Sequence, residues 1–539
     1  MMPYEPRAER TLKRMLEARA DRLGDKPWIL TAKRAYGYRE LDEASNSLAR
    51  GLAALGIKAG ETVLVFLPDT IDFITLWCAL AKLGAIEVPV NVHYKGALLT
   101  HVINDSLAET MIVDRQFLDR IDAVQGELKG LRRLVLYSED ASGAEPGLEG
   151  VLARRFEEVR YETLDGHPAA PLEGGPRYND LMAVMYTSGT TGPSKGVMIT
   201  HAQAYEYACT AVELLNMRAE DVYYAPLPMF HIAGQWAVIY AACIAYATGV
   251  LAGTFSLTGF WDDVRKYEAT CSFLLGAMAN FLYRQPERND DADNPMERVI
   301  VVPLIPEVEE FKRRFGVLVS TTYGGTEQNC PMRSSFELAN ARTCGRLLEE
   351  RYEVRLVDEN DEEVPVGTPG ECLVRGKHPW MTGSGYWNHP EWTVTAWRNN
   401  WVHTGDLLMR DAQGNYYFVD RTKDAIRRRG ENISSMEVEF EVNQHPAVLE
   451  SAVVPVASEH TEEEVMAVVV AKPGATLEPA DLIRFLEPRV AYFMIPRYVR
   501  VVDALPKTPT GKIQKYPLRE AGLVAGTWDR EAAGVKLRR

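Results

Sequence analysis

The chain has 539 residues, of which 46% are hydrophobic and 25% are charged, and its formal net charge is -15. This length exceeds what one hydrophobic core usually supports, so at least two domains are expected. The negative charge argues against a general nucleic-acid or anionic-membrane surface. Wherever such an acidic chain binds a polyanion, it needs backbone N–H groups, a metal ion or placed cations.

Cysteine usage and the N-terminus both indicate a cytoplasmic protein. The seven cysteines are scattered, odd in number and never spaced C-x-x-C, so neither a disulfide framework nor a zinc site is expected. A reducing cytoplasm is the natural compartment for such a chain. Charges occur throughout Met1–Leu16, so no signal peptide is expected there.

Helices and apolar strands alternate along the first part of the chain. One predicted helix contains Leu12 and Leu23, and a second runs from Leu41 to Leu55 before Gly56 ends it. Continuous apolar strands are expected at Thr62–Leu67, Ile86–Pro89, Thr110–Val113, Leu134–Tyr137 and Met182–Tyr186. Strands that are buried on both faces and separated by helices are typical of mainly parallel sheets in a layered α/β fold.

The stretch Trp236–Trp261 contains no charged residue and is long enough to cross a bilayer. Thr248-Gly249 divides it into two shorter apolar pieces. A buried helix followed by a buried strand is therefore the preferred interpretation, and no stable membrane insertion is expected.

The pattern changes after about Thr343. Short segments joined by Gly, Asn and Asp turns predict a small antiparallel β region at Tyr352–Val357, Gly370–Val374 and Tyr416–Val419. Helices are then predicted at Glu437–Val442 and Pro479–Leu486, and strands at Ser451–Val456 and Val465–Ala471. We divide the chain at Asp420–Lys423, into a large domain of residues 1–420 and a small α+β domain of residues 421–539.

The strand Met182–Tyr186 leads directly into ten residues made only of Thr, Ser, Gly, Pro and Lys, Thr187–Gly196. Glycines let a backbone approach a phosphate, hydroxyl groups donate hydrogen bonds, and Lys195 adds a positive charge. The glycine spacing and Gly196 after the lysine exclude a Walker A loop. Composition alone leaves a flexible surface loop as the alternative.

Tyr186–Gly196 resembles the signature loop of the acyl-adenylate-forming superfamily, which includes acyl-CoA synthetases, peptide-synthetase adenylation domains and luciferases. Further segments are similar to motifs of that superfamily and follow in its order, namely Pro226–Gly234, Thr322–Glu327, Trp401–Leu407, Asp420–Glu437 and Pro506–Lys515. The wording RRGENIS looks most like the carnitine or crotonobetaine CoA ligase branch. Val301–Pro306 replaces the small-residue run usual in the family, so we name no residue there for the adenine pocket.

The resemblance implies that a carboxylic acid and ATP form an acyl adenylate, which then gives a thioester of coenzyme A. A carrier-protein thiol is the alternative acceptor. The implied phosphate-binding residues are Thr187, Ser188, Gly189, Thr190, Thr191, Gly192 and Lys195. Tyr323, Gly324 and Thr326 would contact the adenine and the α-phosphate, and Asp406 and Arg421 would contact the ribose. Glu327 would ligate Mg²⁺, since a hard cation prefers carboxylate oxygen.

Several of these residues also have plainer interpretations. Glu327 could be an acid at a helix N-terminus. Thr404-Gly405-Asp406 alone is an ordinary turn, and Arg421 alone is a solvated charge.

The C-terminal motifs imply the catalytic group and the moving part. Lys512 would stabilise the negative charge that develops around the α-phosphorus. Lys423 is the implied hinge, and the loop around Gly430 would face the thiol in the second step. Lys507 and Lys515 are better explained as part of a basic loop, and Arg427–Arg429 equally well as a solvated basic face.

The acyl pocket is expected beside the segment Pro226–Gly234. His231 is the expected gate, with Trp236 and Gly276–Met278 as walls. Core packing of His231 between apolar neighbours is the alternative. The sequence leaves both the identity of the acid and the choice between a monomer and a homodimer open.

Overall fold

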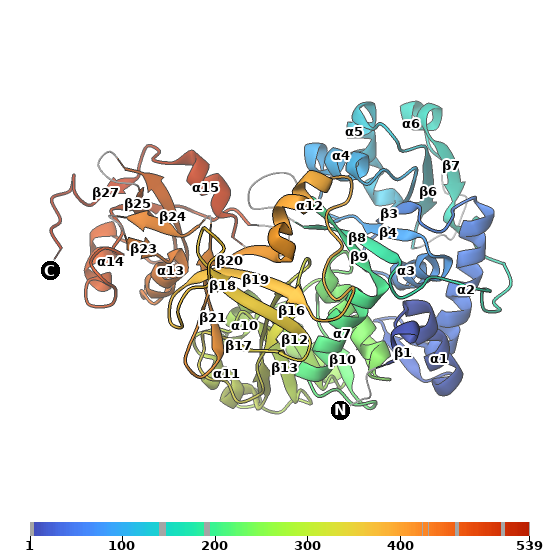
Figure 1. The fold of residues 1–539 in the computed structure, drawn as a ribbon, viewed down its shortest axis with the longest axis horizontal. Helices are drawn as coiled ribbons and strands as arrows, with labels where there is room; N and C mark the ends of the chain where they lie inside the picture. The colour runs from blue at the N-terminus through green and yellow to red at the C-terminus, as the bar shows by residue number, and fades with distance from the viewer. Residues whose placement is uncertain are drawn as a thin grey trace. The chain divides into compact units, whose positions relative to one another are not determined.

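The structure of the protein is a computed structural model (Figure 1), and it describes residues 5–139, 147–187, 194–422, 424–428, 431–458, 463–507 and 513–537. The chain forms two compact units. The larger takes in Met1–Thr187, Pro193–Val354 and Val374–Val402, and the smaller takes in Arg355–Leu373 and His403–Arg539. The predicted division at Asp420–Lys423 stays a prediction.

Two seven-stranded sheets carry most of the larger unit. The first has the order β7-β6-β5-β3-β4-β8-β9, and its neighbouring strands are parallel except for the pair β8–β9. Its strands are β3 (Thr62–Phe66), β4 (Ile86–Pro89), β5 (Thr110–Asp114), β6 (Arg133–Tyr137), β7 (Glu157–Arg160), β8 (Leu181–Thr187) and β9 (Lys195–Thr200). The five strands predicted for this region are confirmed.

The second sheet has the order β14-β13-β12-β10-β11-β1-β2 and is parallel except for the pair β1–β2. Its strands are β1 (Pro27–Leu30), β2 (Ala35–Gly37), β10 (Val222–Tyr224), β11 (Thr248–Val250), β12 (Cys271–Leu275), β13 (Arg298–Val302) and β14 (Leu318–Ser320). A shorter antiparallel meander follows in the same unit: β15 (Thr322–Gly325), β16 (Asn329–Arg333) and β17 (Thr343–Leu347).

Helices separate the two large sheets and cover their outer faces (Figure 1). The side chains of Val63 and Val65 on β3 share one core with Tyr223 on β10 and Phe273 on β12, and the helices α1, α2, α3, α7 and η5 lie in that core. The other faces pack on α4 and α5, and on α9, α10 and α11, respectively. The larger unit is thus a layered α/β fold, as its buried apolar strands predicted.

The helices of the larger unit are α1 (Leu12–Leu23), α2 (Tyr38–Ala54), α3 (Ile71–Leu83), α4 (Gly96–Asp105), α5 (Leu118–Val124), α6 (Gly150–Arg155), α7 (His201–Leu214), α8 (Ala241–Ile244), α9 (Phe260–Lys266), α10 (Gly276–Tyr283), α11 (Val308–Phe315) and α12 (Pro390–Ala396). Short 3₁₀ turns are η1 (Arg7–Glu9), η2 (Arg115–Phe117), η3 (Gln125–Glu127), η4 (Tyr161–Leu164) and η6 (Arg398–Asn400). No helix among the described residues combines the length and the apolar character that crossing a bilayer requires.

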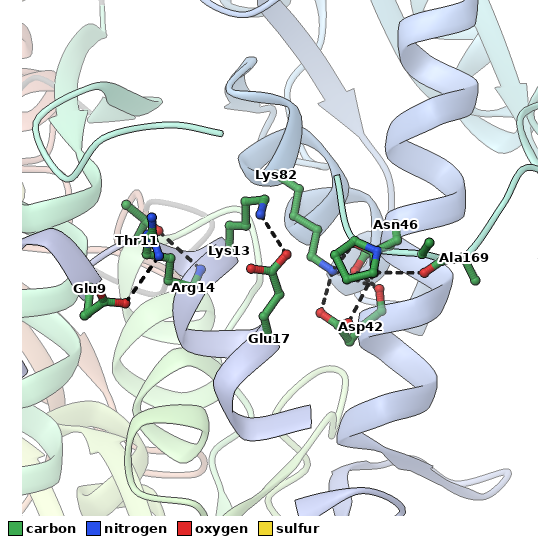
Figure 2. A network of polar contacts seen from close by, with 12 residues as sticks. Glu9, Thr11, Lys13, Arg14, Glu17, Asp42, Asn46, Lys82 and Ala169 are labelled. Atoms are coloured by element: carbon green, nitrogen blue, oxygen red, sulfur yellow. Dashed lines mark hydrogen bonds and ion pairs between the residues drawn. The ribbon is translucent and has the colours of Figure 1, made fainter. Parts of the chain in front are cut away.

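Lys82 is a buried cation within the helical layer (Figure 2). Its Nζ donates to the Asp42 carbonyl oxygen at 2.8 Å, to Asp42 Oδ1 at 2.6 Å and to Asn46 Oδ1 at 2.8 Å. Burial lowers the pKa of Lys82, and the Asp42 carboxylate opposes that shift. These bonds use all three ammonium donors. Lys82 on α3 thus holds Asp42 and Asn46 on α2, and the three residues link the two helices.

The uncharged stretch Trp236–Trp261 contains the predicted buried helix and buried strand, with one difference in geometry. Ala233–Tyr240 (η5) is a π-helix, which continues into α8 before the strand β11. All eight residues of η5 are buried. π-helical turns are rare and often occur at functional sites, and hydrophobic periodicity alone does not distinguish them from α-helical turns.

Glu87 on β4 is a buried carboxyl group opposite η5. It is 1% exposed, and Gln235 Nε2 lies 2.9 Å from Oε1 and 2.8 Å from Oε2. Burial raises the pKa of Glu87 to about 8, and the hydrogen bond from Gln235 only partly opposes this. Gln235 Oε1 has no hydrogen-bond partner in the part of the chain that the structure describes.

We expect Glu87→Gln to stabilise the protein at alkaline pH. The folded state keeps a proton on Glu87 up to about pH 8, whereas the unfolded chain releases it near its ordinary pKa of 4.5. Stability from this group therefore falls as pH rises between those values. A glutamine does not ionise, and its amide can donate to Gln235 Oε1. Thermal unfolding should show a Tm gain of several degrees at about pH 8 that shrinks towards about pH 5. A pH-independent difference would contradict the assignment.

The smaller unit is an α+β fold. The antiparallel hairpin of β20 (Val402–Arg410) and β21 (Asn415–Arg421) precedes a sheet in the order β24-β25-β26-β27, in which only the pair β25–β26 is parallel. The remaining elements here are β22 (Ile426–Arg428), β23 (Glu431–Ile433), α13 (Ser435–Asn443), β24 (Val448–Ala457), β25 (Glu463–Ala471), α14 (Pro479–Leu486), β26 (Tyr498–Val501), α15 (Lys515–Ala521) and β27 (Trp528–Asp529). The strands β18 (Tyr352–Val357) and β19 (Gly370–Gly376) were also predicted, as were α13, α14, β24 and β25.

Candidate active site

The glycine-rich segment joins the antiparallel strands β8 and β9. Thr187, the last residue of β8, is the Cα partner of Lys195, the first residue of β9, and Thr187 Oγ1 donates to the Lys195 carbonyl oxygen at 3.4 Å. The base of the predicted phosphate loop is therefore a strand pair. The predicted phosphate-binding residues Ser188, Gly189, Thr190, Thr191 and Gly192 lie outside the described residues.

The segment Thr322–Glu327 forms a β-hairpin corner. Tyr323 and Gly324 are in β15, Thr326 and Glu327 are in the turn, and β16 follows at Asn329. A Cβ atom on Gly324 would lie 2.2 Å from the Asn329 carbonyl oxygen, so this position requires glycine. The backbone oxygen of Thr326 accepts a hydrogen bond from Gln203 Nε2 at 2.8 Å, which fixes the corner to α7. Glu327 is thus not an acid at a helix N-terminus.

Tyr386 contacts both Lys195 and Glu327. Its hydroxyl donates to Glu327 Oε1 at 3.0 Å, and Lys195 Nζ lies 4.8 Å from the centroid of its ring. A second ring, that of Trp392, lies 5.5 Å from the same ammonium. The structure therefore brings together one predicted phosphate ligand and the predicted metal ligand around an aromatic residue that sequence reasoning did not select.

The sequence did not predict the contact of Tyr386 with Glu327, because 59 residues separate the two positions. Its local signal is a run of aromatic residues from Tyr386 to Trp397, which reads more readily as core packing than as part of a phosphate site. Chain topology, which brings this run beside β9, is what gives it another meaning.

Asp406 and Arg421, the two predicted ribose contacts, are paired within the smaller unit. They are Cα partners across β20 and β21, and Arg421 Nε lies 3.0 Å from Asp406 Oδ1. Asp406 is buried, whereas the Arg421 side chain is 46% exposed. The segment containing Thr404 and Gly405 is not a turn, because it lies inside β20, with Gly405 at φ 69°.

Of the predicted acyl-pocket residues, His231 lies just before η5, Trp236 lies inside it and Gly276 begins α10. His231 precedes η5, and its Nδ1 accepts a hydrogen bond from the Ala233 backbone at 3.2 Å. Trp236 is 1% exposed, and its Nε1 has no hydrogen-bond partner among the described residues. A Cβ on Gly276 would lie 2.6 Å from the Pro303 carbonyl oxygen, so the segment that departs from the family pattern packs directly on this glycine.

The C-terminal lysines fall into two groups. Lys512, the predicted hinge residue Lys423 and the predicted thiol-facing residue Gly430 lie outside the described residues. Lys507 forms an ion pair with Glu450 at 2.6 Å, and Lys515 forms one with Glu439 at 2.8 Å. Burial by itself would lower the pKa of Lys515, but the carboxylates Glu439 and Asp420 outweigh it and raise that pKa. Lys515 is therefore a partly buried, ion-paired cation at the start of α15 rather than a residue of a basic loop.

Glu327 is the carboxylate that could hold a divalent ion at this corner. In the described part of the chain, no three His, Cys, Asp or Glu side chains gather into a metal site. Mg²⁺ does not need such a cage, since it commonly binds one or two carboxylates together with substrate phosphates and water. The Tyr386 hydroxyl donates a hydrogen bond to Oε1 of this carboxylate.

Comparison with known proteins identifies the family. A family model described as AMP-binding enzyme matches residues 16–387, and one described as AMP-binding enzyme C-terminal domain matches residues 437–512. The chain therefore belongs to the AMP-binding enzyme family, which confirms the resemblance to the acyl-adenylate-forming superfamily.

Two relatives found by sequence are named CoA ligases, and a solved structure has the same fold. A crotonobetaine/carnitine–CoA ligase of Salmonella paratyphi A is 30% identical over 520 residues, which cover 94% of this chain and 98% of the relative. One from Escherichia coli is 31% identical over 490 residues, with coverages of 90% and 93%. The structure of ATP-bound MatB from Rhodopseudomonas palustris superposes with a TM-score of 0.83 at 27% identity, with coverages of 94% and 98%. The similarity to the two crotonobetaine/carnitine–CoA ligases places the chain in the carnitine-like branch.

Proposed function

We propose that this protein is an ATP-dependent acid:CoA ligase. In the first step a substrate carboxylate oxygen bonds to the α-phosphorus of ATP, the bond from that phosphorus to the bridging oxygen breaks, and pyrophosphate leaves. In the second step the thiol sulfur of coenzyme A, having lost its proton, bonds to the acyl carbon and AMP leaves. The observation that carries the proposal is that Lys195, at the end of the predicted phosphate loop, and Glu327 both contact Tyr386.

The larger unit would hold the phosphates. Lys195 and Thr187 stand at the two ends of the loop. The Lys195 ammonium would bind the β- and γ-phosphates, and the Thr187 hydroxyl would join it by exchanging its bond to the Lys195 carbonyl oxygen for one to a phosphate oxygen. Glu327 would bind Mg²⁺, which when bound neutralises phosphate charge and polarises the phosphoryl oxygens. Tyr323, Gly324 and Thr326 line the same hairpin corner and would face the adenine and the α-phosphate.

The smaller unit would supply the ribose contacts and the catalytic lysine. Asp406 is an acceptor-only carboxylate suited to two hydroxyl groups, and Arg421 holds it in place. Lys512 would stabilise charge at the α-phosphorus in the first step, and a rotation about Lys423 would then present the loop around Gly430 to the thiol. Such a hinge assembles two sites in succession from one chain.

A panel of carboxylic acids assayed for pyrophosphate release, with and without coenzyme A, tests the proposal. The relatives make carnitine and crotonobetaine the first acids to include. We expect acid-dependent pyrophosphate and AMP, and an acyl-CoA product only when coenzyme A is present. Pyrophosphate without any acyl-CoA would favour a carrier-protein acceptor, and a complete absence of AMP across the panel would end the proposal.

A further inference from the structure

The backbone around Tyr386 is tied to both sides of the phosphate site. On one side it pairs with β9, because Val197 and Tyr386 form an antiparallel bridge and the Trp387 N–H donates to the Gly196 carbonyl at 2.7 Å. On the other side the Gly383 N–H donates to the carbonyl of Glu327 at 2.6 Å. The segment 383–387 thus connects the strand that begins at Lys195 to the turn that carries Glu327.

The side chain of Tyr386 is itself held in place. It is 7% exposed, and its ring meets that of Trp397 edge to face at a centroid distance of 5.5 Å. Its backbone N–H donates to Thr393 Oγ1 at 2.8 Å. A Cβ atom on the preceding Gly385 would lie 2.6 Å from Thr393 Cγ2, so α12 packs tightly against this turn. A side chain fixed by packing and backbone contacts can orient another group.

We propose that Tyr386 is the positioning residue of the phosphate site, an inference that rests on the proposed function. Its hydroxyl fixes the carboxylate of Glu327 in the orientation needed to bind the metal ion. Its ring face fixes the ammonium of Lys195 where a phosphate would approach. One side chain thereby sets the distance between the anion that binds the metal and the cation that binds the phosphate.

The contact with Glu327 uses the hydroxyl of Tyr386, and the contact with Lys195 uses its ring, so substitutions can remove the first contact alone or both contacts together. A hydrogen bond to a metal-ligating carboxylate restricts its rotation, and loss of such an outer contact typically lowers metal affinity by about 10- to 100-fold. An ammonium within about 6 Å of a ring centroid is attracted electrostatically by the ring face. Tyr386→Phe removes only the hydroxyl contact, whereas Tyr386→Leu removes both.

The test measures nucleotide binding rather than turnover. Calorimetry gives the Kd of a non-hydrolysable ATP analogue with and without Mg²⁺, and the ratio of these Kd values reports the metal contribution. In Tyr386→Phe we expect this ratio to fall about tenfold, with the Mg²⁺-free Kd unchanged. In Tyr386→Leu the Mg²⁺-free Kd should also rise a few-fold. The matched control is Tyr137→Phe, which removes a similar hydroxyl contact, to Asp72 Oδ2 at 2.8 Å, from β6.

Thermal unfolding of each variant shows whether the fold is retained, and Tyr386→Phe keeps the packing if Tyr386→Leu does not. Glu327→Gln in the same titration tests whether Glu327 binds the metal ion, separately from whether Tyr386 positions it. If Glu327→Gln lowers the Mg²⁺ ratio and Tyr386→Phe leaves it at the wild-type value, Tyr386 is not the positioning residue. If Glu327→Gln leaves the ratio unchanged, Glu327 is not the metal ligand and the inference is overturned with it. Pyrophosphate release by the wild-type protein tests the ligase activity independently of both results.

Discussion

Replacing Lys512 with alanine is expected to slow adenylate formation by about 10²- to 10³-fold, because attack on the α-phosphorus builds negative charge that a placed ammonium stabilises. Both reactants are already charged, so positioning and electrostatics carry the step and little acid–base catalysis is needed. A supplied acyl adenylate should still be converted to the thioester at close to the wild-type rate. Acid-dependent pyrophosphate release and thioester formation from the adenylate measure the two half-reactions.

The control for this prediction is Lys507→Ala in the same basic segment. Lys507 forms an ion pair with Glu450, and its side chain is 35% exposed. Partly exposed pairs of this kind contribute little to stability, so both half-reactions should stay near wild type. If Lys512→Ala impairs the two half-reactions equally, the assignment of Lys512 to the first step is wrong.

The second large effect is expected from Asp406→Asn, which should weaken ATP binding by about 10- to 100-fold. A hydrogen bond to an ionised group contributes about 1.5–3 kcal/mol, and this carboxylate would accept one from each ribose hydroxyl. Asparagine keeps the shape but loses the charge that both Arg421 and the hydroxyls meet. Calorimetric titration with ATP measures the change, and Asp503→Asn, at an exposed position of the same unit, is the control.

Comparing the binding of ATP and 2′-deoxy-ATP tests whether Asp406 contacts the ribose hydroxyls. The wild-type protein should bind 2′-deoxy-ATP more weakly than ATP, and Asp406→Asn should lose most of that preference. A double-mutant cycle with Arg421→Gln should be non-additive, because the two side chains are in contact. Equal discrimination between ATP and 2′-deoxy-ATP by wild type and variant would contradict the ribose assignment.

Local sequence predicted the elements whose hydrophobic pattern is clear. The strand Met182–Tyr186 was predictable because a continuous apolar run followed by a glycine-rich segment permits few alternatives. The helix Pro479–Leu486 was predictable from its amphipathic spacing and its N-terminal proline. In contrast, Thr404-Gly405-Asp406 has the composition of a turn but lies inside β20, because pairing with β21 overrides local preference.

Residues of the candidate site were predictable only where a single short motif contains the functional side chain. Lys195 and Glu327 were selected because each lies in a segment whose sequence resembles a family motif. The pairing of Asp406 with Arg421 was not foreseen, since the register of two strands is set by the sheet and not by either motif. Gly276 shows the same limit, because its close contact with Pro303 joins segments 27 positions apart in the chain.

The sequence by itself determined the class of fold, the family and most of the residues expected to meet ATP, because these depend on patterns that are complete within short segments. Only the tertiary structure decided that Tyr386 contacts both Lys195 and Glu327, and that Glu87 is a buried acid opposite Gln235. The physical reason is that such contacts depend on burial and on distances between strands far apart in the chain. Folding fixes those quantities, and local composition does not encode them.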